Sequence, residues 1–238
     1  MADERPTDRR PADRRDVCVS SGRMSPVTER SPRLRRDPWT WIGLIWAIAF
    51  VILAIEVNER EAIGFDDPVS AFVKGLPVPT DLWLAITAAG GVILVPIGVA
   101  VVVTLLLLGR ARTAIVYGVA LAGASLWTHV VKVSIGRLRP PEGALVPAPG
   151  FSFPSGHALN SMVTYGLIAL LIWRTDLPAW VRLVSAIGLA TLVALIGLSR
   201  IALGVHYPSD VVGGWLAGLA IVAIVAVATR EPDSERRA

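Results

Sequence analysis

Six apolar segments, each close to the length of a membrane-spanning helix, take up most of the chain and limit what it can fold into. They cover residues 39–57, 82–108, 112–131, 157–173, 179–198 and 211–229. About 20 residues, at 1.5 Å of rise per residue, cross a hydrocarbon core that is about 30 Å thick. The segments lack the alternation of apolar and polar residues that a membrane β-barrel requires. With 53% hydrophobic residues in the chain, the sequence predicts an all-α, polytopic membrane protein with six transmembrane helices.

The second apolar segment, 82–108, is longer than one span needs and contains Gly90, Gly91 and Pro96. Proline and glycine are common causes of sharp bends in helices. We therefore expect this segment to be tilted or kinked, or to place its first turns at the membrane interface.

Polar tails flank the apolar segments. Residues 1–37 are rich in Arg, Asp, Pro and Ser and cannot bury enough apolar surface to fold alone, so they are predicted to form a disordered, Arg-rich cytoplasmic tail. We expect residues 38–230 to form the membrane domain and residues 231–238 a second, short cytoplasmic tail. The interspersed acidic residues of the first tail argue against nucleic-acid binding. Cys18, the single cysteine, forms no internal disulfide and belongs to no cysteine cluster that would hold a metal.

Lysine and arginine in the flanking segments predict the orientation of the chain. One set of flanks holds the Arg-rich tail, Arg110, Arg112, Arg174, Arg182, Arg230, Arg236 and Arg237. The opposite set, residues 58–81, 132–156 and 199–210, holds Arg60, Lys74, Lys132, Arg137, Arg139 and Arg200. Because the more positive flanks stay in the cytoplasm, both termini are predicted to be cytoplasmic and the opposite set extracytoplasmic.

Three polar sequences fall within the extracytoplasmic set. They are KVSIGRLRP at 132–140, FPSGH at 153–157 and SRIALGVHYPSD at 199–210. Together they hold two of the three histidines of the chain and several cationic side chains. This composition indicates a binding site for an anion.

The first polar sequence supplies cations. Lys132 ends the third apolar segment, where the simpler interpretation is an interfacial lysine that reaches the lipid head groups. Arg139 precedes Pro140, which disfavours helix at that position, so Arg139 should project from an extended segment. We interpret Arg137 as a solvated loop charge.

The second polar sequence begins a helix. Ser155 can cap a helix that starts near Gly156, where the first N–H groups are free donors and the backbone allows close approach of a phosphate. An ordinary helix cap is the simpler interpretation of these two residues. His157, however, is an ionisable ring in the first turn at the membrane edge, which indicates a function.

The third polar sequence holds a possible nucleophile. His206 comes just before a helix opened by Pro208, and Asp210 follows one turn later. A carboxylate at this spacing can accept from one ring nitrogen and leave the other free to attack. An aspartate favoured by the helix dipole would explain Asp210 but not His206. For His129, in the third apolar segment, we expect a structural role inside the bundle, with a place beneath the site as the alternative.

Taken in order, these sequences match a known pattern. Lys132, six residues, then Arg139-Pro140 come first; Pro154-Ser155-Gly156-His157 follows; Ser199-Arg200, five residues, His206, three residues and Asp210 complete it. This arrangement resembles the three-part signature of the type-2 phosphatidic acid phosphatase superfamily, which includes membrane lipid phosphate phosphatases and soluble vanadium-dependent haloperoxidases. We see no departure from the signature.

The resemblance implies a helical fold with the site at the outer ends of the bundle, and it implies residue roles. Lys132, Arg139 and Arg200 would hold the phosphoryl oxygens, helped by Ser155 and the Gly156 N–H. His206 would attack phosphorus to give a phosphohistidine while Asp210 holds its ring. His157 would protonate the leaving oxygen and then deprotonate water. No metal and no other cofactor is expected.

The predicted activity is therefore a hydrolase that removes a terminal phosphate from a membrane lipid at the outer face of a bacterial plasma membrane. Polyprenyl diphosphate, phosphatidate and phosphatidylglycerol phosphate remain open as substrates. A non-catalytic lipid-phosphate binding protein or transporter is the alternative, although binding alone needs no nucleophile. A soluble haloperoxidase is disfavoured by the apolar segments. Two roles remain open for the loop 58–81, which contains Phe65, Asp66, Asp67 and Pro68: covering the site or shaping the lipid entrance.

Overall fold

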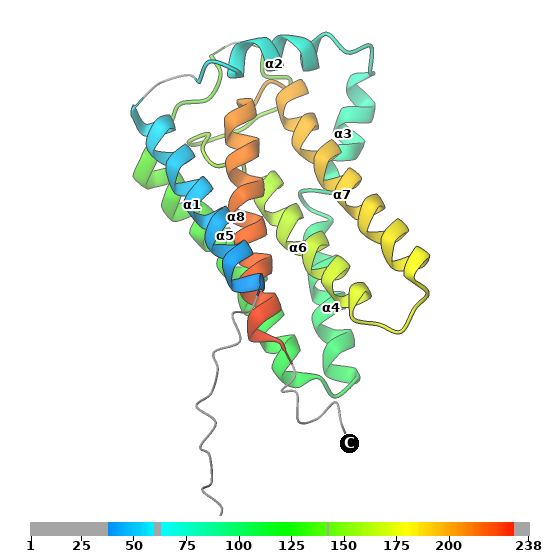
Figure 1. Cartoon of the computed structure of the whole chain (residues 1–238). Coiled ribbons are helices and arrows are strands. Elements are labelled where there is room, and N and C mark those ends of the chain that lie inside the picture. The colour runs from blue at the N-terminus through cyan, green and yellow to red at the C-terminus, as the bar shows by residue number, and fades with distance from the viewer. Residues whose placement is uncertain (1–37, 60–62, 142, 231–238) are drawn as a thin grey trace, which may run out of the picture. The chain divides into compact units, whose positions relative to one another are not determined.

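The computed structural model describes residues 38–59, 63–141 and 143–230, and within these ranges it contains helices and no strands (Figure 1). The helices are α1 (Pro38–Glu59), α2 (Asp66–Lys74), α3 (Thr80–Ala88), α4 (Leu94–Leu107), α5 (Ala111–Ile135), α6 (Gly156–Trp173), α7 (Ala179–Ala202) and α8 (Pro208–Ala228). The all-α prediction is confirmed for this part of the chain. The predicted tails, 1–37 and 231–238, lie outside the described residues, as does Arg60.

Five of these helices are long and apolar enough to cross a membrane: α1, α5, α6, α7 and α8. The sixth predicted span is different, because the apolar segment 82–108 is divided between α3 and α4. At 1.5 Å per residue, α4 with its 14 residues is about 21 Å long, which is short of a typical hydrocarbon core. The described chain is thus an all-helical protein with five candidate spans and a broken sixth segment.

The break between α3 and α4 lies at Gly90 and Gly91. The N–H groups of Gly91 and Ile93 both donate to the Ala88 carbonyl in this turn. A Cβ atom at Gly90 would overlap Ile196 of α7, and one at Gly91 would lie 2.9 Å from Nε2 of His157. Glycine is therefore required here by close packing, and the expected kink is a complete interruption of the helix.

Helices α6 and α8 form the most buried pair of the bundle, and α8 also packs against α1 (Figure 1). Small residues on α8 allow this approach: a Cβ at Gly214 would lie 2.7 Å from the Ser155 carbonyl oxygen, and one at Gly218 would lie 2.6 Å from Met162. Such small residues let membrane helices pack backbone to backbone. The close fit brings the first turns of α6 and α8 together.

Large apolar side chains cover the outer faces of several helices. Ile52 on α1, Val119 on α5 and Val184 on α7 are each more than 60% exposed. Apolar surface of this extent suits a bilayer and not water. The helices and their exposed faces therefore describe a multi-pass membrane protein.

The polar segments collect at one end of the bundle. Helix α2 lies across the ends of α7 and α8 there, as Figure 1 shows. The loop between α5 and α6 reaches the same end, because the Leu145 N–H donates to the Leu203 carbonyl beyond α7. The three polar sequences, far apart along the chain, thus share one region.

Candidate active site

His206 and Asp210 form a buried pair at the start of α8. Nδ1 of His206 lies 3.3 Å from Oδ2 of Asp210, and the backbone N–H of Tyr207 donates to the same oxygen at 2.9 Å. Tyr207 and Asp210 form a capping box that holds this first turn. Because the carboxylate accepts from Nδ1, the other ring nitrogen, Nε2, keeps its lone pair for the site.

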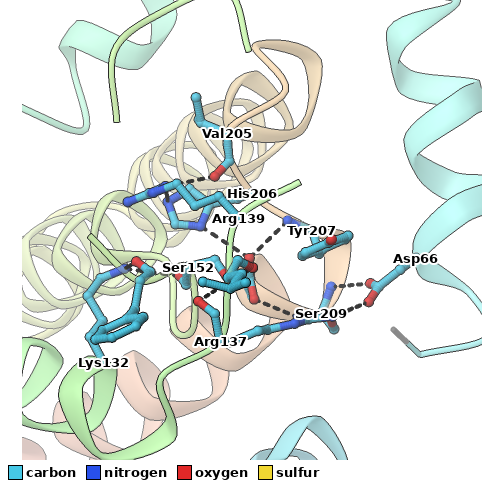
Figure 2. A network of polar contacts seen from close by, with 12 residues as sticks. Asp66, Lys132, Arg137, Arg139, Ser152, Val205, His206, Tyr207 and Ser209 are labelled. Atoms are coloured by element: carbon cyan, nitrogen blue, oxygen red, sulfur yellow. Dashed lines mark hydrogen bonds and ion pairs between the residues drawn. The ribbon is translucent and has the colours of Figure 1, made fainter. Parts of the chain in front are cut away.

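The second ring nitrogen of His206, Nε2, accepts from a cation. Nε2 lies 3.2 Å from Nη1 of Arg139, and Figure 2 shows the two side chains next to each other. Burial is the largest cause that lowers the pKa of His206, the charges of Lys132 and Arg139 add to it, Asp210 opposes it, and the resulting pKa is about 4. The ring is therefore unprotonated at neutral pH, which is the state that a nucleophile needs.

Arg139 lies in an extended segment after α5. Its guanidinium donates from Nη1 to the Val205 carbonyl at 2.7 Å, from Nε to Gly150 at 3.0 Å and from Nη2 to Pro149 at 3.2 Å. Three carbonyls from two loops thus fix the guanidinium beside His206. An arginine held in this way presents a preorganised positive charge.

Lys132 and Arg200 come from the last turns of α5 and α7. Nζ of Lys132 points into the loop before α6 and donates to the Phe151 and Ser152 carbonyls at 2.6 and 3.0 Å. Nη1 of Arg200 donates to Oγ1 of Thr87 on α3 at 2.8 Å, while its Nε is buried and has no hydrogen-bond partner among the described residues. Both cations turn toward the interior of this end of the bundle.

Ser155 precedes the first residue of α6, yet its side chain does not cap the helix, so the predicted cap is wrong. The residue is fully buried, and within the described ranges its Oγ has no hydrogen-bond partner. Its N–H donates to the Asp210 carbonyl at 2.9 Å, which ties the start of α6 to α8. A buried hydroxyl left unpaired is unfavourable unless something else binds it.

His157 stands in the first turn of α6 against the turn between α3 and α4. Its Nε2 packs on Gly91, where a Cβ atom added to the glycine would lie only 2.9 Å away. The charges of Arg200, Arg139 and Lys132 all act on the His157 ring, as does His206. The structure therefore brings the two histidines and the three predicted cations into one cluster.

The prediction that Arg137 is a solvated loop charge is wrong. Arg137 is buried, not solvated: Nη2 lies 2.8 Å from Oδ2 of Asp66, Nη1 lies 2.7 Å from Oδ1 of Asp210, and the guanidinium sits 4.1 Å from the Tyr207 ring centre. Figure 2 shows it on the side of the site that faces Asp66. The sequence contained no local signal for this pair, because 71 residues separate Arg137 from Asp66.

Two other residues were missed or misread in the sequence. Thr87, which binds Arg200, looked like an ordinary residue of an apolar segment. His129 lies on the exposed face of α5, so the predicted structural role inside the bundle is wrong. Neighbouring residues of an α-helix point in different directions, so the helical period of α5 would have placed His129 on a different face from Thr128, which is buried.

A groove of about 610 Å³ leads to the cluster between α4, α5 and α6. Its walls are mainly apolar, with Val99 and Val102 from α4 and Leu121 from α5. His157 and Asn160 line it on α6. Val99 is 58% exposed, so the groove reaches the outer surface of the bundle.

Relatives with curated names share part of this chain. It is 37% identical over 102 residues to phosphatidylglycerophosphatase B of Bacillus subtilis, covering 42% of this chain and 50% of that one. It is 38% identical over 96 residues to undecaprenyl-diphosphatase of Sulfolobus acidocaldarius, covering 38% and 42%. It is 41% identical over 114 residues to decaprenylphosphoryl-5-phosphoribose phosphatase of Mycobacterium tuberculosis, covering 44% and 57%. The chain spans about half the length of the curated relatives it matches.

Solved structures and a family model also match this chain. The crystal structure of a transmembrane PAP2 type phosphatidylglycerolphosphate phosphatase from Bacillus subtilis superposes with a TM-score of 0.70 and 26% identity, covering 78% of this chain and 94% of that one. Aquifex aeolicus LpxE shares the fold, with a TM-score of 0.55 and 19% identity over 70% and 97% of the two chains. The model of the PAP2 superfamily matches residues 113–232. The chain belongs to the PAP2 superfamily.

Proposed function

We propose that this protein is an integral-membrane lipid phosphatase that hydrolyses a terminal phosphate through a phosphohistidine intermediate. The observation that carries the proposal is the geometry of His206. Its Nδ1 faces Asp210 and its Nε2 faces Arg139, so one nitrogen is oriented and the other is directed at an anion site. Low pKa and burial keep this nitrogen unprotonated and reactive.

A phosphate would complete the hydrogen bonding of the cluster. Lys132, Arg139 and Arg200 supply positive charge, and the start of α6 supplies N–H groups. Oγ of Ser155 and Nε of Arg200 are buried donors without partners in the described part of the chain. Phosphoryl oxygens are strong acceptors, and both groups gain a partner when one binds.

The reaction would proceed in two displacements. In the first, Nε2 of His206 attacks phosphorus, the bond to the leaving oxygen breaks, and His157 gives that oxygen a proton. In the second, His157 takes a proton from water, the water oxygen attacks phosphorus, and the N–P bond breaks. Phosphate leaves, and His206 and His157 return to their starting states.

The groove supports a lipid as the substrate. It is apolar along α4 and α5 and reaches His157 at its polar end, so a hydrocarbon chain in it would direct its head group at the cluster. The relatives are named as phosphatases of phosphatidylglycerophosphate, of undecaprenyl diphosphate and of decaprenylphosphoryl-5-phosphoribose, which are all lipids that carry phosphate. Polyprenyl diphosphate, phosphatidate and phosphatidylglycerol phosphate are the candidates for this chain.

The site would face outward from the plasma membrane of a bacterium, with both termini in the cytoplasm and α3 and α4 together completing a sixth crossing. The distribution of Lys and Arg supports this orientation, because the flanks opposite the site carry more of them.

The test is phosphate release by purified protein in detergent with excess EDTA, using each of the three candidate lipids. We expect release by the wild type and a loss of about 1,000-fold or more in His206→Ala, since the nucleophile is removed. His129→Ala is the matched control, because this exposed histidine lies outside the cluster, and it should retain full activity. Release by His206→Ala at the wild-type rate would rule out the phosphohistidine, and no release from any lipid by folded wild type would rule out the phosphatase.

A further inference from the structure

A chain of buried charges extends behind His206, away from the phosphate site. Arg137 joins two carboxylates, with Nη1 on Asp210 at 2.7 Å and Nη2 on Asp66 at 2.8 Å. The side chains of all three are at most 4% exposed. The planar fork of arginine suits this bridge, and a lysine ammonium cannot make both contacts in the same geometry.

The two carboxylate oxygens of Asp210 have different partners, and Arg137 binds one of them. Oδ1 of Asp210 accepts from Arg137, while Oδ2 faces Nδ1 of His206 and accepts from the Tyr207 N–H. The carboxylate is therefore held in one rotation, with a single oxygen turned to the imidazole. Loss of Arg137 would leave Oδ1 buried without this partner and would free the carboxylate to rotate.

Asp66 anchors both Arg137 and the start of α8. Its Oδ1 accepts from the Ser209 N–H at 2.8 Å, and its Oδ2 accepts from the Ser209 hydroxyl at 2.7 Å and from Arg137. Ser209 precedes Asp210 directly, so α2 fixes the turn that carries the partner of the nucleophile. Figure 2 shows Asp66 reaching toward Ser209 from a separate element.

We propose that Asp66 and Arg137 are positioning residues that act on His206 through Asp210, an inference that rests on the proposed role of His206 as the nucleophile. Arg137 orients the carboxylate that orients the ring, and Asp66 holds Arg137 in place. Neither residue contacts the substrate. Asp66, the first residue of α2 within the loop 58–81, thereby links this loop to the positioning of His206.

The arrangement has an electrostatic signature. The charged and titratable groups that act on His206 or Asp210 are Lys132 from α5, Arg137 and Arg139 from the segment after it, and His157 from α6, while Arg200 from α7 acts on His157 and Lys132. Removing the positive charge of Arg137 should make the pair of His206 and Asp210 bind a proton more tightly. Removing the negative charge of Asp66 should weaken proton binding by the same pair. A role limited to packing would not produce shifts of opposite sign.

The experiment compares Arg137→Gln, Arg137→Lys and Asp66→Asn in the full-length protein in detergent. The ring of His206 is titrated by NMR on histidine-labelled protein, with the His206→Asn variant assigning its signal. We expect the pKa of His206 to rise by about one unit in Arg137→Gln and to fall by a smaller amount in Asp66→Asn. Arg137→Lys keeps the charge and should leave the pKa near the wild-type value.

Kinetics provide the second readout. We expect kcat for phosphate release to fall about 10- to 100-fold in all three variants, because a small misplacement of the nucleophile is enough for such a loss. KM should stay within about twofold, since these residues do not touch substrate. Asp67→Asn is the matched control: it changes the same charge one residue away at an exposed position of α2 and should alter neither kcat nor the pKa of His206.

Shifts of the same sign in Arg137→Gln and Asp66→Asn, or wild-type kcat in both, would overturn the inference. If Arg137→Gln does not fold, the fall in the pKa of His206 in Asp66→Asn decides, with an unchanged pKa counting against it. The titration does not depend on turnover. If the wild type released no phosphate but the pKa of His206 still rose in Arg137→Gln and fell in Asp66→Asn, the proposed reaction would be wrong. The proposed positioning of His206 would still stand.

Discussion

Ser155 keeps a buried hydroxyl at the start of α6, next to the cluster of cations, and this hydroxyl has no partner in the part of the chain that the structure describes. An unsatisfied buried polar group lowers stability by about 1–3 kcal/mol. Alanine at this position would avoid that loss without creating a large cavity. The buried hydroxyl is consistent with the proposed role of Ser155 in binding a phosphoryl oxygen.

Substituting Ser155 separates stability from activity. In Ser155→Ala we expect thermal stability equal to or above the wild type and kcat/KM lower by about 100-fold, the loss typical of one donor to a developing oxyanion. Ser161→Ala on the same helix is the control, because the Ser161 hydroxyl already donates to the Ala158 carbonyl at 3.1 Å. That variant should keep its activity. Thermal unfolding and phosphate release measure the two effects, and full activity in Ser155→Ala would contradict the assigned role.

Some residues of the site could be predicted from the sequence and others could not. His206 and Asp210 are one helical turn apart, so their contact follows from local spacing. Arg137 could not be interpreted in this way, because its partners come from α2 and α8 and only the folded bundle brings them together. In the sequence alone, nothing distinguishes Arg137 from any other arginine in a loop.

Among the elements, the break between α3 and α4 shapes the site most directly. It brings the Gly90–Gly91 turn against the His157 ring, and it allows Thr87, at the end of α3, to accept from Arg200. A continuous helix over 82–108 would carry a straight apolar wall past this position. The interruption therefore supplies one side of the pocket around His157.

A single methyl group tests this contact. In Gly91→Ala the new Cβ would lie 2.9 Å from Nε2 of His157, so the ring must move. We expect kcat to fall by about 10- to 100-fold, since the ring is the proposed acid and base. Gly123→Ala in α5 is the control, because a Cβ there meets nothing within 4 Å among the described residues. Phosphate release by the two variants is compared, and equal rates would show that the turn leaves His157 unaffected.

The six apolar segments predicted most helices within a few residues, because hydrophobic length is encoded locally. The segment 82–108 was predicted to bend, but its division into two helices could not be predicted, because the neighbours of the two glycines, Ile196 and His157, come from α7 and α6. Helix α2 was not predicted at all. Its nine residues carry three charges and a proline, and the helix is held in place by the buried contacts of Asp66.

For the whole molecule, the proposed membrane orientation can be tested by labelling a cysteine of the natural sequence. Cys18 is the only cysteine in the sequence and belongs to the tail that should be cytoplasmic. A membrane-impermeant maleimide should therefore label it in permeabilised cells and not in intact ones. For the other side, Leu145→Cys in a Cys18→Ser background places a thiol at a position that is 56% exposed at the site end, and intact cells should label it. The reverse pattern would put the site on the cytoplasmic side.

The groove between α4, α5 and α6 has a consequence for how the rate should be described. If a lipid enters through it, the substrate never passes through bulk water, and the encounter takes place in two dimensions. Turnover would then follow the mole fraction of substrate in the membrane or micelle and not its molarity. Adding inert detergent at constant substrate would slow the reaction, and abundant neighbouring lipids with similar chains would act as competitors simply by being present.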